Sequence, residues 1–436
     1  MRDRDAKGII LSALQEQPDF SHLPTLAKMS GGESRKFLRW LDRSGLALSF
    51  LRRLQTCQVA SLLPAEILLA LEQRLAKNTR RLRDMLDEFH RLHQAFHAHD
   101  VSAVTLKGFS LAPDFCEDLS LRHQTDFDFL IAPESVEPAA KALQSCGYST
   151  ARLSHSGESC FTTPLLHIPS QNDDLYAVQP HRQVDLHTSI SENYPWLSLQ
   201  VPSDCLAHAE SQTINGQPRL GLSLADKFLV QTLHAFRHSF RSWIRLSWLF
   251  EISRCMVLHR NDRALWDRVI LRAGETLPVR RAIALILRLT HGLFASPIPA
   301  RMKAWSRDAV TPAMYAWLEK FSVTWAVADW PGSLSNLFLA KDFIPDRKLR
   351  IKYLQSRILP RKAQTSLGTL AKTSRLLSLQ LRPAQLQYVA HRSSVHLRDI
   401  LGLPLQQIRW MQALRHVRAR ALSSEVKLPL PSGGMP

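Results

Sequence analysis

Residues 122–131 read RHQTDFDFLI. In this run Asp126 and Asp128 alternate with large apolar residues, which is the pattern of a β-strand with one buried face. The two carboxylates would lie on the same side of the strand, roughly 6 to 7 Å apart. Such neighbours repel each other unless a cation lies between them, and hard ions such as Mg²⁺ take oxygen ligands of this kind. The run therefore predicts either a metal site or the exposed face of an edge strand.

Length and composition predict an ordinary folded protein. The chain has 436 residues, of which 45% are apolar and 22% charged, and it carries a formal net charge of +18 at pH 7. This length suggests two to three domains with a large core. The six cysteines have no short paired spacing, which argues against a zinc site or a disulfide framework. We find no secretory leader pattern and no apolar run of about 18 residues, so we expect a cytoplasmic protein without a transmembrane segment.

The positive charge is concentrated near the C-terminus. Residues 347–420 contain sixteen Lys or Arg and one acidic residue, Asp399. Such a surplus favours a polyanionic partner, which would be RNA, DNA or an anionic membrane surface. Solvated helix faces are an equally weighted alternative.

The spacing of apolar residues predicts an α+β fold. Helices are expected in short blocks over residues 7–63, as one long amphipathic helix from Pro64 to His99 or Asp100, and over 136–146; strands are expected at 101–106, 126–131, 163–168 and 183–188. After Ile190 the pattern turns helical again and mostly stays so. The long helix carries four histidines, which we interpret as solvated rather than metal-binding.

These expectations divide the chain into five parts. The predicted parts are a helical N-terminal region (1–100), a small mixed-sheet core (101–195), a helical domain (196–345), a basic helical C-terminal region (346–425) and a disordered tail (426–436).

Two further motifs flank the predicted strands. Lys107 and Gly108 follow the first strand. A glycine at this place lets the backbone approach a phosphate closely, and a helix beginning near Ser110 would direct its N-terminal amides toward that phosphate. In the strand at 183–188, Asp185 and His187 share one face.

With these motifs together, the chain resembles the family of uncharacterised nucleotidyltransferases within the DNA polymerase beta-like superfamily. The resemblance covers about residues 60–260. Its marks are Leu106-Lys107-Gly108, Arg122 with the run at 126–131, Gly147-Tyr148, Val184-Asp185-Leu186-His187, and His234-x-x-x-His238 followed by Arg245, Trp248, Leu249 and Glu251.

The resemblance implies a magnesium-dependent enzyme that moves a nucleoside monophosphate from a nucleoside triphosphate to a hydroxyl acceptor. It implies that Asp126, Asp128 and Asp185 hold two Mg²⁺ ions, and that Asp185 helps to deprotonate the acceptor. The nucleotide, the acceptor and the oligomeric state are left open. The rival hypothesis is a non-catalytic protein of the same fold that binds nucleic acid or an anionic surface through its basic C-terminal region.

The resemblance also implies nucleotide-binding residues. Lys107 and Gly108 stand where the superfamily usually has a Gly-Ser pair, and they would meet the triphosphate, while Arg122 could hold a phosphate. Possible substrate-binding residues are His187, His234, His238 and Arg245, with packing inside the fold as the alternative for the three histidines.

Overall fold

The computed structural model describes residues 3–153, 157–164, 174–178, 182–190, 196–199, 201–241, 244–328, 334–358 and 375–423. The chain forms two compact units. The first unit contains residues 1–192, 199–236 and 245–307, and the second contains residues 193–198, 237–244 and 308–436.

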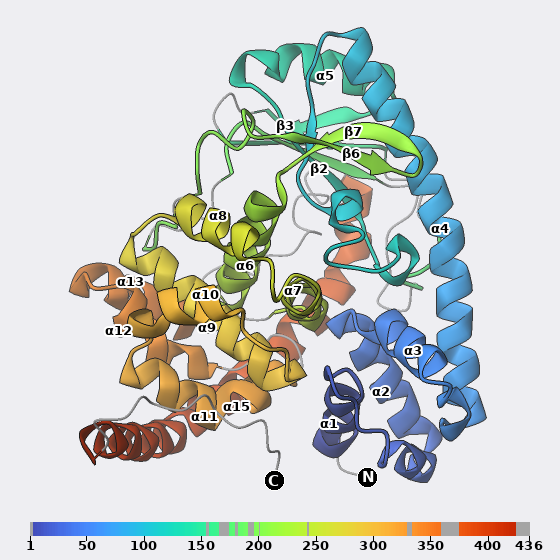
Figure 1. The fold of residues 1–436 in the computed structure, drawn as a ribbon. Helices are drawn as coiled ribbons and strands as arrows, with labels where there is room; N and C mark the ends of the chain where they lie inside the picture. Colours follow the sequence, from blue (N-terminus) through green and yellow to red (C-terminus); the bar gives the residue numbers. More distant parts are fainter. Residues whose placement is uncertain are drawn as a thin grey trace. The chain divides into compact units, whose positions relative to one another are not determined.

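The N-terminal part of the first unit is helical, as predicted. Its helices are α1 (Asp3–Ala13), η1 (Leu23–Lys28), α2 (Gly31–Ser44), α3 (Ala47–Thr56), η2 (Ala60–Leu62) and α4 (Ala65–Ala98). Helix α2 begins with a capping box, in which Ser30 and Glu33 each accept from the other's backbone N–H. The predicted long helix is confirmed as α4, which extends from α1–α3 to the level of α5 (Figure 1).

A seven-stranded mixed sheet forms the centre of the first unit, which confirms the α+β class. The strands are β1 (Val104–Thr105), β2 (Asp126–Leu130), β3 (Ser149–Arg152), β4 (Glu158–Thr162), β5 (Gln183–His187), β6 (Glu210–Ile214) and β7 (Gln217–Gly221). Their order is β3-β4-β5-β2-β1-β7-β6. The pairs β2–β5 and β1–β7 are parallel and the other pairs are antiparallel. The short helices beside these strands are η3 (Gly108–Leu111), η4 (Leu119–Leu121), η5 (Pro133–Ser135) and α5 (Val136–Ser145).

The alternation of acidic and apolar residues along β2 determines which face of this strand is buried. Phe127 and Phe129 of β2 point into a core with Phe89 and Phe96 of α4 and with apolar residues of α5. Burying a large apolar side chain in this way stabilises the fold by roughly 1.5 to 3 kcal/mol. The side chains of Asp126 and Asp128 consequently lie on the opposite face of β2.

His93 of α4 contradicts the expectation that the helix histidines are solvated. Its ring packs edge-on against Phe89 at 4.5 Å and against Phe129 at 5.4 Å between ring centroids. Burial, with help from the nearby Arg219, lowers the pKa of His93 to about 3. The sequence pattern missed this because a histidine among charged residues looks solvated until the sheet covers it.

Of four predictions about the strands and the adjoining helix, three are wrong or incomplete, and the one at 163–168 stays a prediction. Strand β1 is only two residues long, and a 3₁₀ turn, η3, replaces the α-helix expected from Ser110. Most of the strand predicted at 163–168 lies outside the described residues. The largest error is the hairpin β6–β7, which lies in a stretch that was read as helical. Its turn, Asn215-Gly216, has φ angles of 48° and 75°, the left-handed conformation that two-residue hairpins require.

The remainder of the described chain is helical. The elements are α6 (Leu224–Arg241), α7 (Leu246–Leu258), α8 (Arg263–Ala273), α9 (Leu277–Phe294), α10 (Ala300–Trp305), η6 (Arg307–Ala309), α11 (Pro312–Ala326), η7 (Leu334–Leu339), α12 (Ala340–Phe343), α13 (Arg347–Ile358) and α15 (Arg375–Ser423). No helix among the described residues has the length and hydropathy needed to cross a bilayer. The predicted disordered tail lies outside the described residues.

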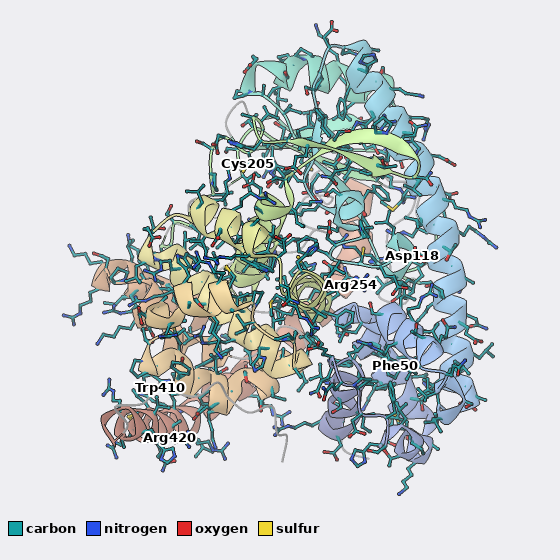
Figure 2. All side chains as sticks on the ribbon, in the orientation of Figure 1. Phe50, Asp118, Cys205, Arg254, Trp410 and Arg420 are labelled. Carbon is teal, nitrogen blue, oxygen red and sulfur yellow. The ribbon has the colours of Figure 1, made fainter. Side chains whose placement is uncertain are left out.

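Aromatic residues form the core of the second unit. Phe240 stacks on Tyr353 with ring centroids 4.9 Å apart, and the Tyr353 hydroxyl donates to the Phe240 carbonyl oxygen at 2.9 Å. On α15, Trp410 stacks on Phe338 with ring centroids 5.3 Å apart, and Figure 2 labels the side chains of Trp410 and Arg420.

Candidate active site

The pairing of β2 with β5 brings the three predicted carboxylates together on one face of the sheet. The two strands are parallel, and Asp128 is the register partner of Asp185. Register partners on neighbouring strands lie about 4.8 Å apart and point to the same side. Asp126 lies two residues before Asp128 and therefore shares this face.

Asp128 is held by two basic groups. Its Oδ1 atom lies 3.4 Å from Lys107 Nζ and 3.2 Å from His187 Nε2. Burial acts to raise the pKa of Asp128, but the Lys107 ammonium and the His187 hydrogen bond outweigh burial and hold the pKa below its usual value. The structure thus joins Lys107 and His187, which the sequence offered for different roles, at one carboxylate oxygen.

Asp185 has polar neighbours that the sequence reasoning missed. Gln183 Nε2 donates to both carboxylate oxygens, at 3.0 and 2.8 Å. Cys160 of β4 is the register partner of Asp185 and forms a side-chain hydrogen bond with it. Burial and the charge of Asp128 raise the pKa of Asp185. The alternation of β5 could have identified Gln183, whereas Cys160 lies on a strand that was not predicted.

Asp126 is affected by the charges of both other carboxylates. Burial and the negative charge of Asp128 raise its pKa to about 6, although Lys107 opposes the rise. The side chain of Gln124 donates to the Asp126 carbonyl oxygen at 2.9 Å. Gly108, with a φ angle of 65°, lies so close to Gln124 that a Cβ atom would be 2.4 Å from Gln124 Nε2. In this structure, Gly108 therefore makes room for a side chain that supports Asp126.

The three carboxylates are chemically suited to bind a hard divalent cation. Asp126 and Asp185 have raised pKa values because negative charges are crowded in a buried place, and a cation would offset that crowding. Carboxylate oxygens are also the ligands that Mg²⁺ prefers. Over the described ranges, however, no three His, Cys, Asp or Glu side chains converge as a formed metal site. Bonds from Lys107, His187 and Gln183 use several of the carboxylate oxygens instead.

Arg122 faces a carboxylate of the protein itself. Its Nε atom lies 2.9 Å from Glu251 Oε1, and both side chains are largely buried.

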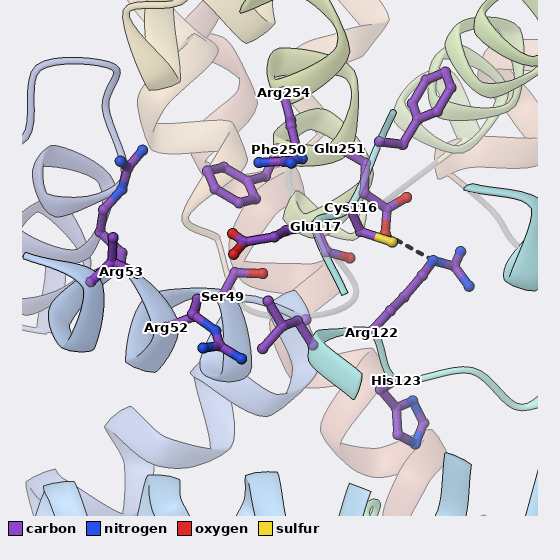
Figure 3. A pocket seen from close by; sticks show the side chains of 15 residues that line it. Ser49, Arg52, Arg53, Cys116, Glu117, Arg122, His123, Phe250, Glu251 and Arg254 are labelled. Carbon is purple, nitrogen blue, oxygen red and sulfur yellow. Dashed lines mark hydrogen bonds and ion pairs between the residues drawn. The ribbon is translucent and has the colours of Figure 1, made fainter. Parts of the chain in front are cut away.

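The nearby cavity of about 130 Å³ is lined by α3, residues 115–123 and α7 (Figure 3). Figure 3 shows Arg52, Arg254 and Glu117 among its labelled side chains. None of the three strand carboxylates lines this cavity, so it is separate from the candidate active site.

The remaining predicted residues lie in different surroundings. Arg245 is buried and contacts His123, with its Nη2 3.3 Å from the ring Nδ1. His234 packs edge-on against Trp248 at 4.8 Å, and its charge contributes to the low pKa of Asp128. His238 follows one turn later on α6 and belongs to the second unit.

Comparison with known proteins gives one match. A family model described as uncharacterised nucleotidyltransferase matches residues 30–295, which include the whole sheet and all three carboxylates. No curated protein and no solved structure matches the chain.

Proposed function

Because the chain belongs to the family of uncharacterised nucleotidyltransferases, we propose that it is a magnesium-dependent enzyme that transfers a nucleoside monophosphate from a nucleoside triphosphate to a hydroxyl acceptor. One observation carries the proposal: in the β2–β5 register Asp126, Asp128 and Asp185 share one face of the sheet, where Asp185 is buried and the other two are partly buried. Buried, crowded carboxylates are costly to a fold, and a function that uses their charge accounts for them.

The three carboxylates are assigned to metal binding. Asp126, Asp128 and Asp185 would hold Mg²⁺, which when bound neutralises phosphate charge and stabilises the attacking and leaving oxygens of an in-line displacement. Two ions are expected by analogy with other two-metal nucleotidyl-transfer sites.

The other roles belong to side chains of this site. Asp185 is the candidate base because its raised pKa favours accepting a proton from the acceptor hydroxyl. Lys107 neutralises charge at Asp128 and is placed to meet a phosphate as a point charge. His187 donates to Asp128 and thereby orients that carboxylate.

The test is label transfer from each labelled nucleoside triphosphate in a lysate with Mg²⁺. The double variant Asp126→Asn/Asp128→Asn should lose transfer and pyrophosphate release while keeping its circular dichroism spectrum. Asp84→Asn, which changes an exposed carboxylate on α4, is the matched control and should leave transfer unchanged. Full turnover in the double variant would rule out this assignment.

A second candidate function is binding of nucleic acid or an anionic surface without catalysis. It is favoured by the exposed arginines of α15, namely Arg398, Arg409, Arg415 and Arg418. Reversing three of these charges (Arg409→Glu, Arg415→Glu and Arg418→Glu) should abolish salt-dependent binding to RNA, DNA or anionic vesicles. If binding is lost in this variant and the wild type transfers no nucleotide under any condition, the non-catalytic function is correct.

A further inference from the structure

Helix α4 buries a guanidinium group that makes no hydrogen bond to any residue that the structure describes. The side chain of Arg81 is 1% exposed, and within that described part of the chain none of its three guanidinium nitrogens has a hydrogen-bond partner. Ionised groups inside proteins are normally paired, since an uncompensated buried charge is strongly destabilising. The surroundings of Arg81 are therefore incomplete without an added negative group.

The position of Arg81 is fixed by a neighbouring contact. Asn78, one turn earlier on α4, donates to the carbonyl oxygens of Ser120 and Arg122 at 2.7 and 3.1 Å. Residues three apart on a helix lie on the same face. Arg81 consequently faces the segment that leads into β2, and it interacts electrostatically with Asp126.

Two of the charged groups that act on Arg81 are themselves guanidinium groups. Burial, followed by the charges of Arg182 and Arg245, lowers the pKa of Arg81 to about 10. Arg182 is paired with Glu88 at 3.1 Å, but Arg245 has an unpartnered buried Nε atom. Arg81 and Arg245 thus both have unused donors among the described residues, and both interact electrostatically with Asp126 of the candidate active site.

We propose that Arg81 and Arg245 form the oligophosphate-binding part of this site and receive the phosphates of the nucleotide donor. The proposal rests on the proposed function. Two planar guanidinium groups offer many N–H donors in a fixed geometry that matches phosphate oxygens, and an oligophosphate brings more negative charge than one carboxylate. Asp126 interacts electrostatically with both arginines, so phosphates bound there would lie near the carboxylates.

The proposal also explains why an unpaired charge is retained. A ligand that binds only the folded state stabilises it by mass action. The ligand-free protein bears the cost of burying Arg81, and oligophosphate binding removes that cost. Replacing Arg81 by an apolar side chain should therefore leave the ligand-free protein at least as stable as wild type, while abolishing the stabilisation by the ligand.

The experiment measures thermal unfolding of the full-length chain with and without sodium tripolyphosphate, at 0.15 M salt and without Mg²⁺. Tripolyphosphate should raise the Tm of wild type and of the control Arg83→Met, which changes an exposed arginine on the same helix. Arg81→Met should show an unchanged or higher Tm without ligand and no shift with it. Arg245→Met should reduce the shift.

Three results would overturn the proposal. One is a full tripolyphosphate shift in Arg81→Met, and the second is a ligand-free Tm of Arg81→Met several degrees below wild type, because this would reveal an internal partner. The third is an equal shift with orthophosphate, which would indicate a single-phosphate site.

The transfer assay separates this proposal from the proposed function. Arg81→Met should raise the KM for the nucleoside triphosphate roughly 10- to 100-fold, the effect of losing charge-assisted hydrogen bonds. An unchanged KM with active transfer would reject the phosphate site and leave the transferase intact. Tripolyphosphate binding without any transfer by wild type would reject the transferase instead.

Discussion

Gly108 should be among the positions least tolerant of a single added methyl group. Replacing it by alanine imposes a side chain on a backbone with φ of 65°, which costs about 1 to 2 kcal/mol. The new Cβ would also lie 2.4 Å from Gln124 Nε2 and displace that side chain from the Asp126 carbonyl oxygen. Losing this bond costs about 1 to 3 kcal/mol where the carbonyl is left unsatisfied. Alanine also lowers the conformational entropy of the unfolded chain, which by itself stabilises the folded state by about 0.4 to 1 kcal/mol.

The expected net loss is therefore about 1 to 5 kcal/mol in the free energy of unfolding. Urea denaturation followed by circular dichroism measures it. Gly147→Ala is the matched control, because Gly147 has a φ of 87° but a Cβ there would meet nothing within 4 Å. The double variant Gly108→Ala/Gln124→Ala should recover part of the loss, since it removes the clash. If Gly108→Ala costs no more than Gly147→Ala, the close contact with Gln124 is not important.

Three other changes test the packing around the site and in the second unit. Glu251→Gln removes the buried partner of Arg122 and should cost about 3 to 5 kcal/mol in urea denaturation. The pKa of His93 is lowered to about 3 in the folded protein, whereas an unfolded histidine has a pKa of about 6.5. The wild-type free energy of unfolding should therefore be highest above about pH 6.5 and should fall by up to about 1.4 kcal/mol per pH unit between about pH 6.5 and about pH 3. His93→Phe removes this titrating group and should make the free energy of unfolding less dependent on pH in this range. Val417→Ala, at a side chain of α15 that is 1% exposed, should cost about 2 kcal/mol, measured as a shift of the urea midpoint.

Each of these predictions has a counterpart on the surface. Glu319→Gln removes the exposed partner of Arg420 and should change stability by less than about 1 kcal/mol. Leu401→Ala, at a position 74% exposed, should stay within about 0.5 kcal/mol. His97→Phe, at an exposed histidine of α4, should change the free energy of unfolding at neutral pH by less than about 0.5 kcal/mol. Equal losses in the buried and surface variants would contradict the burial pattern on which the predictions rest.

The sequence was sufficient to predict the helices and strands in which apolar residues recur with a strong period. The alternation around Asp126 predicted β2, and the leucine spacing after Pro64 predicted α4, because one buried face determines both patterns. The hairpin β6–β7 was missed although Asn215-Gly216 is a strong turn signal. Its strands are mostly exposed, so they lack the apolar alternation on which the reading relied.

The sequence singled out the acidic residues of the candidate site and also Lys107 and His187, which contact Asp128, but it did not indicate Arg81, Gln183 or Cys160. Alternation and family resemblance identified Asp126, Asp128 and Asp185, and the register of β2 with β5 places them together. Arg81 gave no signal, because an arginine in an amphipathic helix looks solvated until the sheet and Arg245 are placed around it. Burial of a charge is a property of tertiary structure that local spacing does not encode.

The parallel pairing of β2 with β5 has a consequence for how the protein matures. A parallel partner cannot follow through a tight turn, so α5, β3 and β4 intervene between the aspartates of the two strands. Closing this long connection lowers the entropy of the chain before any stabilising contact between β2 and β5 has formed. Such non-local pairings therefore form slowly. The acidic cluster is thus assembled after the local helices, and a newly synthesised chain acquires its charge-crowded centre only once the residues through β5 have emerged and docked.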